Sequence, residues 1–250
     1  MLQALYIVIV NPYDSQELLD QYLLFHYGSP EEILPYPSGP VSALDFPRRS
    51  VVENIDTTVP RSRALDLGCA VGRSSFELSA FCSEVVGIDS SEQFIAAAEY
   101  LRKEPGLAYR RLEEGIISTE LVAHRPESSN PERIRFETGD ALNLDGDLGG
   151  FDVLHAANLL CRLPEPEQFL AGLQHLVTVN GLLILTTPCT WLGEFTRPGN
   201  WPVGATHEWL ADRLSASFDL LKIKDMPFLI REHARKYQWG VAQASVWQRS

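Results

Sequence analysis

The sequence has few cysteines, few cationic side chains for its length and no long uninterrupted hydrophobic run. Its four cysteines, Cys69, Cys82, Cys161 and Cys189, form no C-x-x-C pair and no spacing typical of a metal site. We therefore expect no metal centre and no disulfide framework, and a reduced cytoplasmic protein is the simplest interpretation. No internal repeat or low-complexity tract is visible, which argues against a solenoid.

The charge balance is acidic, with 21 Lys and Arg against 33 Asp and Glu and a formal net charge of −12. Such a surface repels phosphate backbones and disfavours nucleic acid as a partner. An apolar stretch at residues 2–10 is far shorter than the ~20 residues of a membrane-spanning helix, and it lacks the features of a signal peptide. We expect it to form a loosely attached strand, or an extension of the start, of a soluble protein.

The 250 residues suit one full-size α/β domain with an extension. Residues 1–58 are interpreted as an N-terminal helical and loop extension that caps the active site. In its stretch 17–27, Leu18, Tyr22 and Phe25 are spaced as on one helical face. A proline-rich loop follows at 29–40, and a second helix is expected around 51–55.

From Arg63 onward, strands and helices alternate along the chain. The expected strands cover 64–67, 84–89, 133–138, 151–157 and 182–187, and the expected helices cover 73–81, 92–103 and 166–178. Two closing strands, 218–224 and 243–248, are expected to be antiparallel. Residues 106–132 are polar and predicted to be an irregular insertion. The alternation predicts a Rossmann-like domain over 59–250, with a parallel sheet covered on both faces and ligand sites at its carboxyl edge.

The most informative motif is a glycine-rich turn that follows the first of these strands. Gly68 and Gly72 lack a Cβ, so the backbone can turn tightly there and approach a ligand closely. A dinucleotide fingerprint would need glycines at 68, 70 and 73, where the chain has Gly68, Ala70 and Arg73. The pattern D-x-G-x-x-x-G instead resembles motif I of class I S-adenosylmethionine-dependent methyltransferases.

Three later strand ends agree with that resemblance. Asp89 ends the second strand, where a carboxylate can accept hydrogen bonds from both ribose hydroxyls. Asp140 and Ala141 match the adenine position, and Asn158 matches the position facing the methyl group. The residues expected to bind S-adenosylmethionine are Asp66, Gly68, Cys69, Ala70, Gly72, Arg73, Asp89, Ser90, Asp140, Ala141 and Asn158.

Stretches outside these motifs resemble the methyltransferase half of the ovothiol biosynthesis protein OvoA and its stand-alone form, OvoM. They are residues 22–28, 39–48, 67–73, 157–163, 187–196 and 233–239, and the resemblance runs from Tyr13 to Gln248. It implies a seven-stranded, mostly parallel sheet with one antiparallel strand. It also implies a separate enzyme that N-methylates 5-thiohistidine to ovothiol A. The sulfoxide synthase would then be a candidate pathway partner. Cys161 and Cys189 depart from the family pattern and leave the finer substrate assignment open.

A zwitterionic amino acid needs a cation for its carboxylate, and arginine offers a bidentate fork. Arg48 and Arg162 lie in family-like stretches, whereas Arg197 and Arg235 are further candidates. The aromatic candidates for the substrate ring are Tyr27, Tyr36, Phe46 and Trp191. A neutral imidazole carries its own lone pair, so no strong base is required. Candidate catalytic groups are His26, Tyr27 and Asn158, while His155 is interpreted as a core histidine.

Three alternatives stay open at this point. The protein could methylate another small-molecule acceptor on the same scaffold, or it could be a catalytically silent methyltransferase-like binding subunit. A nicotinamide-dependent dehydrogenase is the third alternative. It is disfavoured by Arg73 and by the Gly139-Asp140-Ala141 element.

Overall fold

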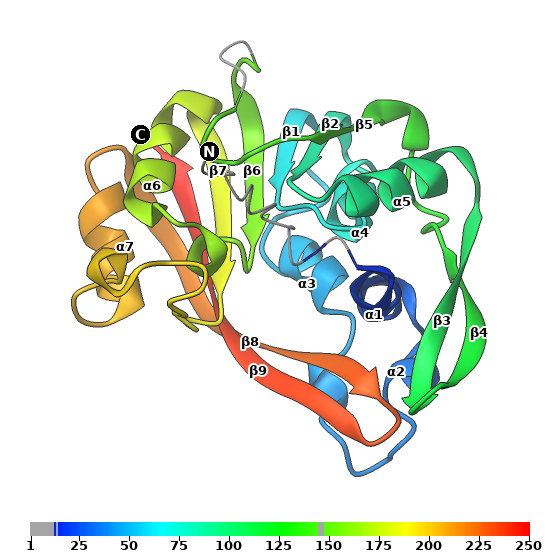
Figure 1. Cartoon of the computed structure of the whole chain (residues 1–250). Coiled ribbons are helices and arrows are strands. Elements are labelled where there is room, and N and C mark those ends of the chain that lie inside the picture. The colour runs from blue at the N-terminus through cyan, green and yellow to red at the C-terminus, as the bar shows by residue number, and fades with distance from the viewer. Residues whose placement is uncertain (1–12, 14, 145–147) are drawn as a thin grey trace, which may run out of the picture.

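The computed structural model describes residues 13, 15–144 and 148–250 (Figure 1). The apolar run at 2–10, expected to form a strand, lies outside the described residues. No helix in the described part of the chain is long and apolar enough to cross a membrane.

A seven-stranded sheet organises the molecule, in the order β5-β2-β1-β6-β7-β9-β8. Its strands are β1 (Arg61–Leu67), β2 (Cys82–Asp89), β5 (Ile134–Thr138), β6 (Phe151–Ala157), β7 (Val177–Thr187), β8 (Phe218–His233) and β9 (Lys236–Arg249). The first five pair in parallel, and β9 is antiparallel to both of its neighbours. The predicted fold class is therefore confirmed.

Neighbouring residues of a strand point to opposite faces of the sheet, and helices cover both faces, so both are buried. Ala64 and Val85 pack with Phe76 of α4 (Arg73–Leu78) and Phe94 of α5 (Glu92–Lys103). On the other face, strand leucines pack against α6 (Pro166–Leu176) and α7 (Thr206–Leu214). The strands therefore read as continuous apolar runs.

The segment 106–132 is more regular than its composition indicated. It contains a hairpin of β3 (Gly106–Glu114) and β4 (Ile117–His124), followed by a short 3-10 helix, η2 (Pro131–Arg133). Tyr109 and Ala123 are the buried residues of the two strands, and the other side chains are partly or fully exposed. The prediction of an irregular insertion was wrong because a two-stranded sheet with so little buried surface is mostly polar.

The two closing strands are much longer than predicted. β9 pairs with β7 only through residues 243–248, and beyond that point β8 and β9 continue as a free hairpin past the sheet (Figure 1). Smaller corrections concern element bounds. The predicted helices 73–81 and 166–178 end at Leu78 and Leu176, and Asn180, with φ of 65°, lies within β7 rather than before it.

The segment before β1 forms α1 (Gln16–Tyr27), α2 (Pro30–Ile33), a 3-10 turn η1 (Val41–Ala43) and α3 (Phe46–Val52). The helix expected around 51–55 therefore lies earlier. The Ser15 side chain accepts a hydrogen bond from the Leu18 backbone and starts α1. Figure 1 shows α1 between the sheet and the two hairpins. The segment before β1 and the β8–β9 hairpin therefore both lie over the carboxyl edge of the sheet.

Candidate active site

Three residues of the turn after β1 have a positive φ, a backbone conformation that glycine adopts readily. Gly68, Ala70 and Gly72 have φ of 70°, 47° and 88°, in the left-handed region. A Cβ on Gly72 would lie 2.7 Å from the Phe136 ring, so packing as well as φ requires glycine there. Gly68 and Ala70 line the cavity at this edge, whereas Gly72 supports the turn from behind and does not line it.

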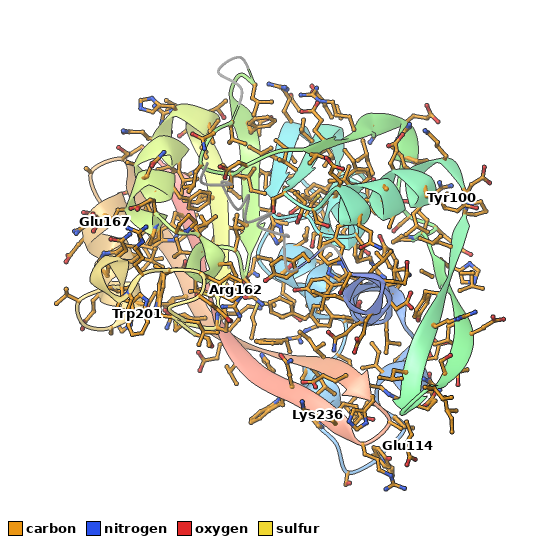
Figure 2. The ribbon with its side chains drawn as sticks, in the orientation of Figure 1. Tyr100, Glu114, Arg162, Glu167, Trp201 and Lys236 are labelled. Carbon is orange, nitrogen blue, oxygen red and sulfur yellow. The ribbon has the colours of Figure 1, made fainter. Side chains whose placement is uncertain are left out.

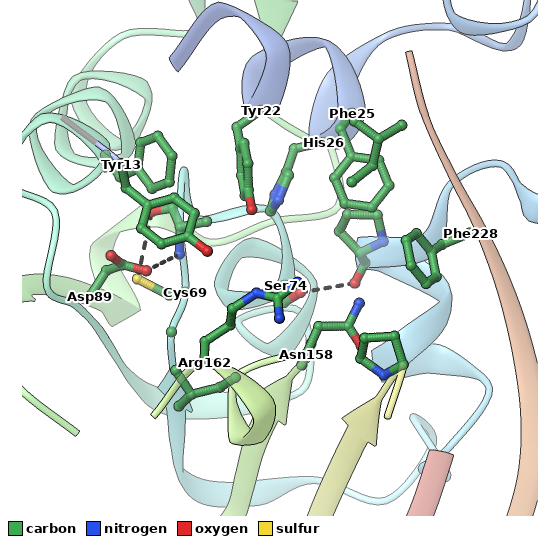
Figure 3. A pocket seen from close by; sticks show the side chains of 18 of the residues that line it. Tyr13, Tyr22, Phe25, His26, Cys69, Ser74, Asp89, Asn158, Arg162 and Phe228 are labelled. Atoms are coloured by element: carbon green, nitrogen blue, oxygen red, sulfur yellow. Dashed lines mark hydrogen bonds between the residues drawn. The ribbon is translucent and has the colours of Figure 1, made fainter. Parts of the chain in front are cut away.

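Asp89 is held next to this turn by backbone donors. Its Oδ2 accepts the Ala70 N–H at 2.9 Å and its Oδ1 accepts the Ser91 N–H at 2.9 Å (Figure 3). Burial raises the pKa of Asp89, and the backbone N–H groups oppose that rise. Each carboxylate oxygen can accept more than one hydrogen bond, so the group retains capacity for two hydroxyls of a ligand.

Asp140 follows β5 and lies at the same edge. Its Oδ1 accepts the Leu142 N–H at 2.9 Å and its Oδ2 accepts the Asn143 side-chain amide at 2.7 Å. The Gly139 N–H is bonded to the Asp89 carbonyl, which ties the two strand ends together. Asp140, Ala141 and Ser90, which the sequence analysis assigned to cofactor binding, all line the cavity.

A cavity of about 660 Å³ runs along this edge, beneath α1 and the β8–β9 hairpin. Leu18, Tyr22 and Phe25, the helical face recognised in the sequence, all line it. The cavity also receives side chains that sequence reasoning did not assign to the site: Tyr13, Ser74, Phe195, Phe228 and Trp239. In the sequence, this wall was indicated only by the apolar face of the helix expected at 17–27. The spacing of such a face is the same whether it packs in a core or lines a cavity.

Arg162 enters the cavity from the sheet side, opposite α1 (Figure 3). It ends the short 3-10 helix η3 (Leu160–Arg162), its Nη1 donates to the Thr190 carbonyl at 3.1 Å, and its guanidinium lies 4.7 Å from the centre of the Phe195 ring. It makes no ion pair with any carboxylate of the described residues. The guanidinium of Arg162 can therefore pair with an anionic group of a ligand.

Asn158 lies beside Arg162 at the end of β6, with φ of 56°. Its Oδ1 accepts the Thr186 hydroxyl at 2.9 Å, and its backbone N–H donates to the Thr186 carbonyl at 2.8 Å. These bonds hold the side chain at the cavity wall with its NH2 group left to donate to a ligand.

His26 faces Arg162 from α1 (Figure 3). Its Nδ1 is buried and has no hydrogen-bond partner among the described residues, and its ring stacks on Tyr22 with centroids 5.9 Å apart. Burial, together with the nearby Arg73, lowers the pKa of His26 to about 3. The imidazole is therefore neutral at physiological pH.

Four predicted residues lie outside the cavity because their side chains have partners elsewhere. Tyr27 donates from its hydroxyl to the Val71 carbonyl at 2.7 Å. Arg73 pairs with Glu77 at 2.8 Å and donates to the His26 carbonyl, and Arg48, with a side chain 46% exposed, pairs with Asp45. Trp191 donates to the Thr206 hydroxyl and packs on Trp209.

Tyr36 also lies outside the cavity, exposed on the surface, where its hydroxyl donates to the Ala234 carbonyl at 3.1 Å. Of the predicted aromatic walls, only Phe46 lines the cavity. Asp66 lines it too, but its two oxygens accept from Ser75 and His155 within the core, so its role is to support the turn. His155 is fully buried and bonded at both ring nitrogens, as expected of a core histidine.

Burial raises the pKa of both Cys69 and Cys161, so both are protonated thiols at neutral pH rather than nucleophiles. Among residues 13, 15–144 and 148–250, no three His, Cys, Asp or Glu side chains gather as a metal site would require.

Comparison with known proteins places this geometry in a family. Residues 59–245 match the family model described as a methyltransferase domain. A curated relative, the ubiquinone biosynthesis O-methyltransferase of Methylococcus capsulatus, is 26% identical over 155 residues, which are 60% of this chain and 54% of that protein. The chain thus spans about half the length of the relative it matches.

Solved structures show the same fold at low identity. The N-methyltransferase NodS of Bradyrhizobium japonicum, in complex with S-adenosyl-L-homocysteine, is 13% identical with a TM-score of 0.56, covering 92% of this chain and 98% of that chain. A methyltransferase from Methanosarcina mazei is 16% identical with a TM-score of 0.53, covering 78% and 94%.

The residues at the carboxyl edge fit S-adenosylmethionine. Asp89 has carboxylate acceptors that would suit two ribose hydroxyls, Asp140 and Ala141 line the cavity at the neighbouring strand end, and Gly68 lines it without a side chain. The match covers three quarters of the chain, and the edge carries the acidic and glycine positions that this cofactor needs. The chain belongs to the family of class I S-adenosylmethionine-dependent methyltransferases.

Proposed function

We propose that this protein methylates a ring nitrogen of 5-thiohistidine to give ovothiol A, the last step of ovothiol biosynthesis. The resemblance to the methyltransferase half of OvoA supports this acceptor, since it runs from Tyr13 to Gln248 and includes the stretches around Tyr22, Phe46 and Arg162. The class of acceptor it implies is a small zwitterion with an aromatic ring.

The observation that carries the proposal is the guanidinium of Arg162 inside the cavity, which makes no ion pair with a carboxylate of the described residues. A guanidinium without a carboxylate partner binds the carboxylate of an amino acid through charge-assisted hydrogen bonds. The aromatic surface that faces it, with Tyr22, Phe25 and Phe228, suits the flat face of an imidazole. A neutral acceptor without a carboxylate would leave the Arg162 charge uncompensated.

The cofactor supplies an electrophilic methyl group on a sulfonium. The chain's contribution is alignment: the aromatic rings exclude water, and Asn158 donates its NH2 to fix one edge of the acceptor. S-adenosylmethionine held at this edge would supply a methyl carbon that takes the lone pair of a ring nitrogen while its bond to sulfur breaks. The proton on the other ring nitrogen would pass to solvent water.

His26 positions the acceptor in this scheme and does not serve as a strong base. With a pKa of about 3, its imidazole holds a proton poorly at neutral pH. Its ring, which stacks on Tyr22 and lines the cavity, would instead pack against the bound acceptor.

The direct test incubates the protein with S-adenosylmethionine and 5-thiohistidine and follows the product by mass spectrometry. A gain of about 14 Da, the mass of one CH₂, placed on a ring nitrogen by fragmentation, is expected. Histidine without the sulfur is the control acceptor. Methyl transfer to sulfur, or turnover only with an unrelated hydroxyl, amine or thiol acceptor, would refute the assignment while leaving the methyltransferase activity in place.

A further inference from the structure

A second cavity, of about 640 Å³, lies between α1 and the free ends of the two hairpins. Arg110, Arg111 and Ser118 line it from the β3–β4 hairpin, and Arg231 and Lys236 line it from β8 and β9. Figure 2 shows the tips of the two hairpins, labelled at Glu114 and Lys236, at the same corner of the molecule. The hairpins are joined there by the bond from Arg231 Nη2 to Glu113 Oε2, at 2.7 Å.

One guanidinium charge on the hairpin wall is in excess of the carboxylates that pair with it, whereas Arg110 pairs with Glu120 at 3.8 Å. Arg111 and Arg231 both pair with the single carboxylate of Glu113, at 2.6 and 2.7 Å, and both also donate to the Glu32 carbonyl. Arg231 is only 4% exposed, and its Nε has no hydrogen-bond partner in the described part of the chain. Two guanidinium groups that share one carboxylate leave a positive charge that a carboxylate ligand would balance.

The opposite wall is acidic. Glu17 and Asp20 line the cavity from α1, and burial raises the pKa of Asp20. Lys236 is compensated locally, because its Nζ pairs with Glu232 at 2.5 Å. The cavity therefore has a cationic surplus on its hairpin wall and carboxylates on its helix wall, which complements a molecule with a carboxylate at one end and an ammonium at the other.

Gln21 and Gln238 line both this cavity and the cofactor cavity, so the two adjoin at these side chains. We propose that the second cavity is an outer binding site for a zwitterionic amino acid, the acceptor itself, from which it passes between Gln21 and Gln238 to the methyl group. This inference rests on the proposed function. Capture at this site raises the local concentration of the acceptor and does not take part in the methyl transfer.

Two variants test the outer site by steady-state kinetics with 5-thiohistidine and saturating S-adenosylmethionine. Gln238→Trp narrows the junction, and Arg231→Met removes the buried cation at similar side-chain length. Arg235→Trp, on the neighbouring turn, and Arg213→Met, on α7, are the matched controls. We expect kcat/KM for the acceptor to fall about tenfold in both test variants, through KM. In Arg231→Met, whose side chain does not line the cofactor cavity, the affinity for S-adenosylhomocysteine, by calorimetry, and the single-turnover rate at saturating acceptor should stay within about twofold of the parent.

Thermal melting identifies a variant that does not fold. If Arg231→Met does not fold, Gln238→Trp still tests the outer site, because Gln238 is exposed and its replacement should not prevent folding. An unchanged kcat/KM in Gln238→Trp would overturn the outer site while leaving the proposed function intact. An equal loss in Arg235→Trp would overturn it as well. No methylated product from the parent protein with 5-thiohistidine would instead refute the proposed function, and the outer site with it.

Discussion

His155 Nδ1 donates to Asp66 Oδ1 at 2.8 Å beneath the glycine-rich turn, where both side chains are 2% exposed or less. The other ring nitrogen, Nε2, lies 3.0 Å from the hydroxyl of Ser50 on α3. The spacing resembles that of a Ser-His-Asp hydrolytic triad, but Ser50 is fully buried and cannot meet a substrate. The three residues instead connect the helical segment before β1 to the strand that positions the glycine-rich turn.

Replacing His155 should therefore destabilise the protein. His155→Gln would leave the buried Asp66 carboxylate without this donor, and we expect the free energy of unfolding to fall by about 3 kcal/mol. Denaturant unfolding followed by circular dichroism measures it. His175→Gln on the exposed face of α6 is the matched control and should change stability by less than about 0.5 kcal/mol. Equal stability of the two variants would mean that the buried bond contributes little.

Asp89 is expected to dominate ribose binding. Asp89→Ala removes acceptors for two hydroxyls and should weaken S-adenosylhomocysteine binding by about 1–3 kcal/mol, measured by isothermal titration calorimetry. Asp219→Ala, on the exposed part of β8, is the control. If Asp89→Ala binds as tightly as the parent, the ribose does not lie at the end of β2.

The pKa of His26 makes stability depend on pH. The folded pKa, about 3, lies below the ordinary value of 6.5, so the unfolded chain binds the proton more tightly. The His26 contribution is fully present above pH 6.5 and is lost progressively as the pH falls toward 3. It should amount to about 1.4 kcal/mol between pH 8 and pH 5.5.

Denaturant titrations of the parent and of His26→Gln at both pH values measure this contribution. The variant should show a smaller loss of stability on acidification, by that amount. Parallel losses in the two proteins would mean that His26 is not the titrating group, or that it is accessible to water in solution.

Arg162 is expected to hold the acceptor rather than the cofactor. Arg162→Met should raise KM for the acceptor about 10- to 100-fold, because charge-assisted hydrogen bonds are lost, and should leave S-adenosylhomocysteine affinity within about threefold. Arg162→Lys, which keeps the charge but loses the planar fork, should fall between the two. A loss of cofactor affinity with an unchanged acceptor KM would assign Arg162 to the methionine carboxylate instead.

Gly72 should be intolerant of a side chain for two reasons that can be separated. Gly72→Ala combines a left-handed φ of 88° with a Cβ 2.7 Å from the Phe136 ring. Gly115→Ala, in the β3–β4 turn, has a φ of 58° and no atom within 4 Å of the added Cβ. We expect a loss of about 1–2 kcal/mol at Gly115 from backbone strain alone and a larger loss at Gly72, by thermal or denaturant unfolding. Equal losses would mean that Phe136 moves away without cost.

The sequence by itself determined the sheet, the cofactor edge and the family. Alternating apolar strands and amphipathic helices leave little choice of topology, and parallel strands bring their carboxyl ends to one edge. Gly68 and Gly72, and Asp89 and Asp140 at strand ends, are recognised from local motifs and from their order along the chain. Those residues could therefore be named without coordinates.

Only the tertiary structure decided which side chains face the cavity. Arg48 and Arg162 lie in equally family-like stretches, yet Arg48 pairs with Asp45 at the surface while Arg162 points into the cavity. The outer half of the β8–β9 hairpin supplies Phe228 and Trp239, although its polar and mixed residues predict no cavity wall. Phe228 and Trp239 reach the cavity because segments far apart in the sequence, such as α1 and β8, are in contact. The partners of a side chain, rather than its residue type alone, decide where its charge or ring is directed.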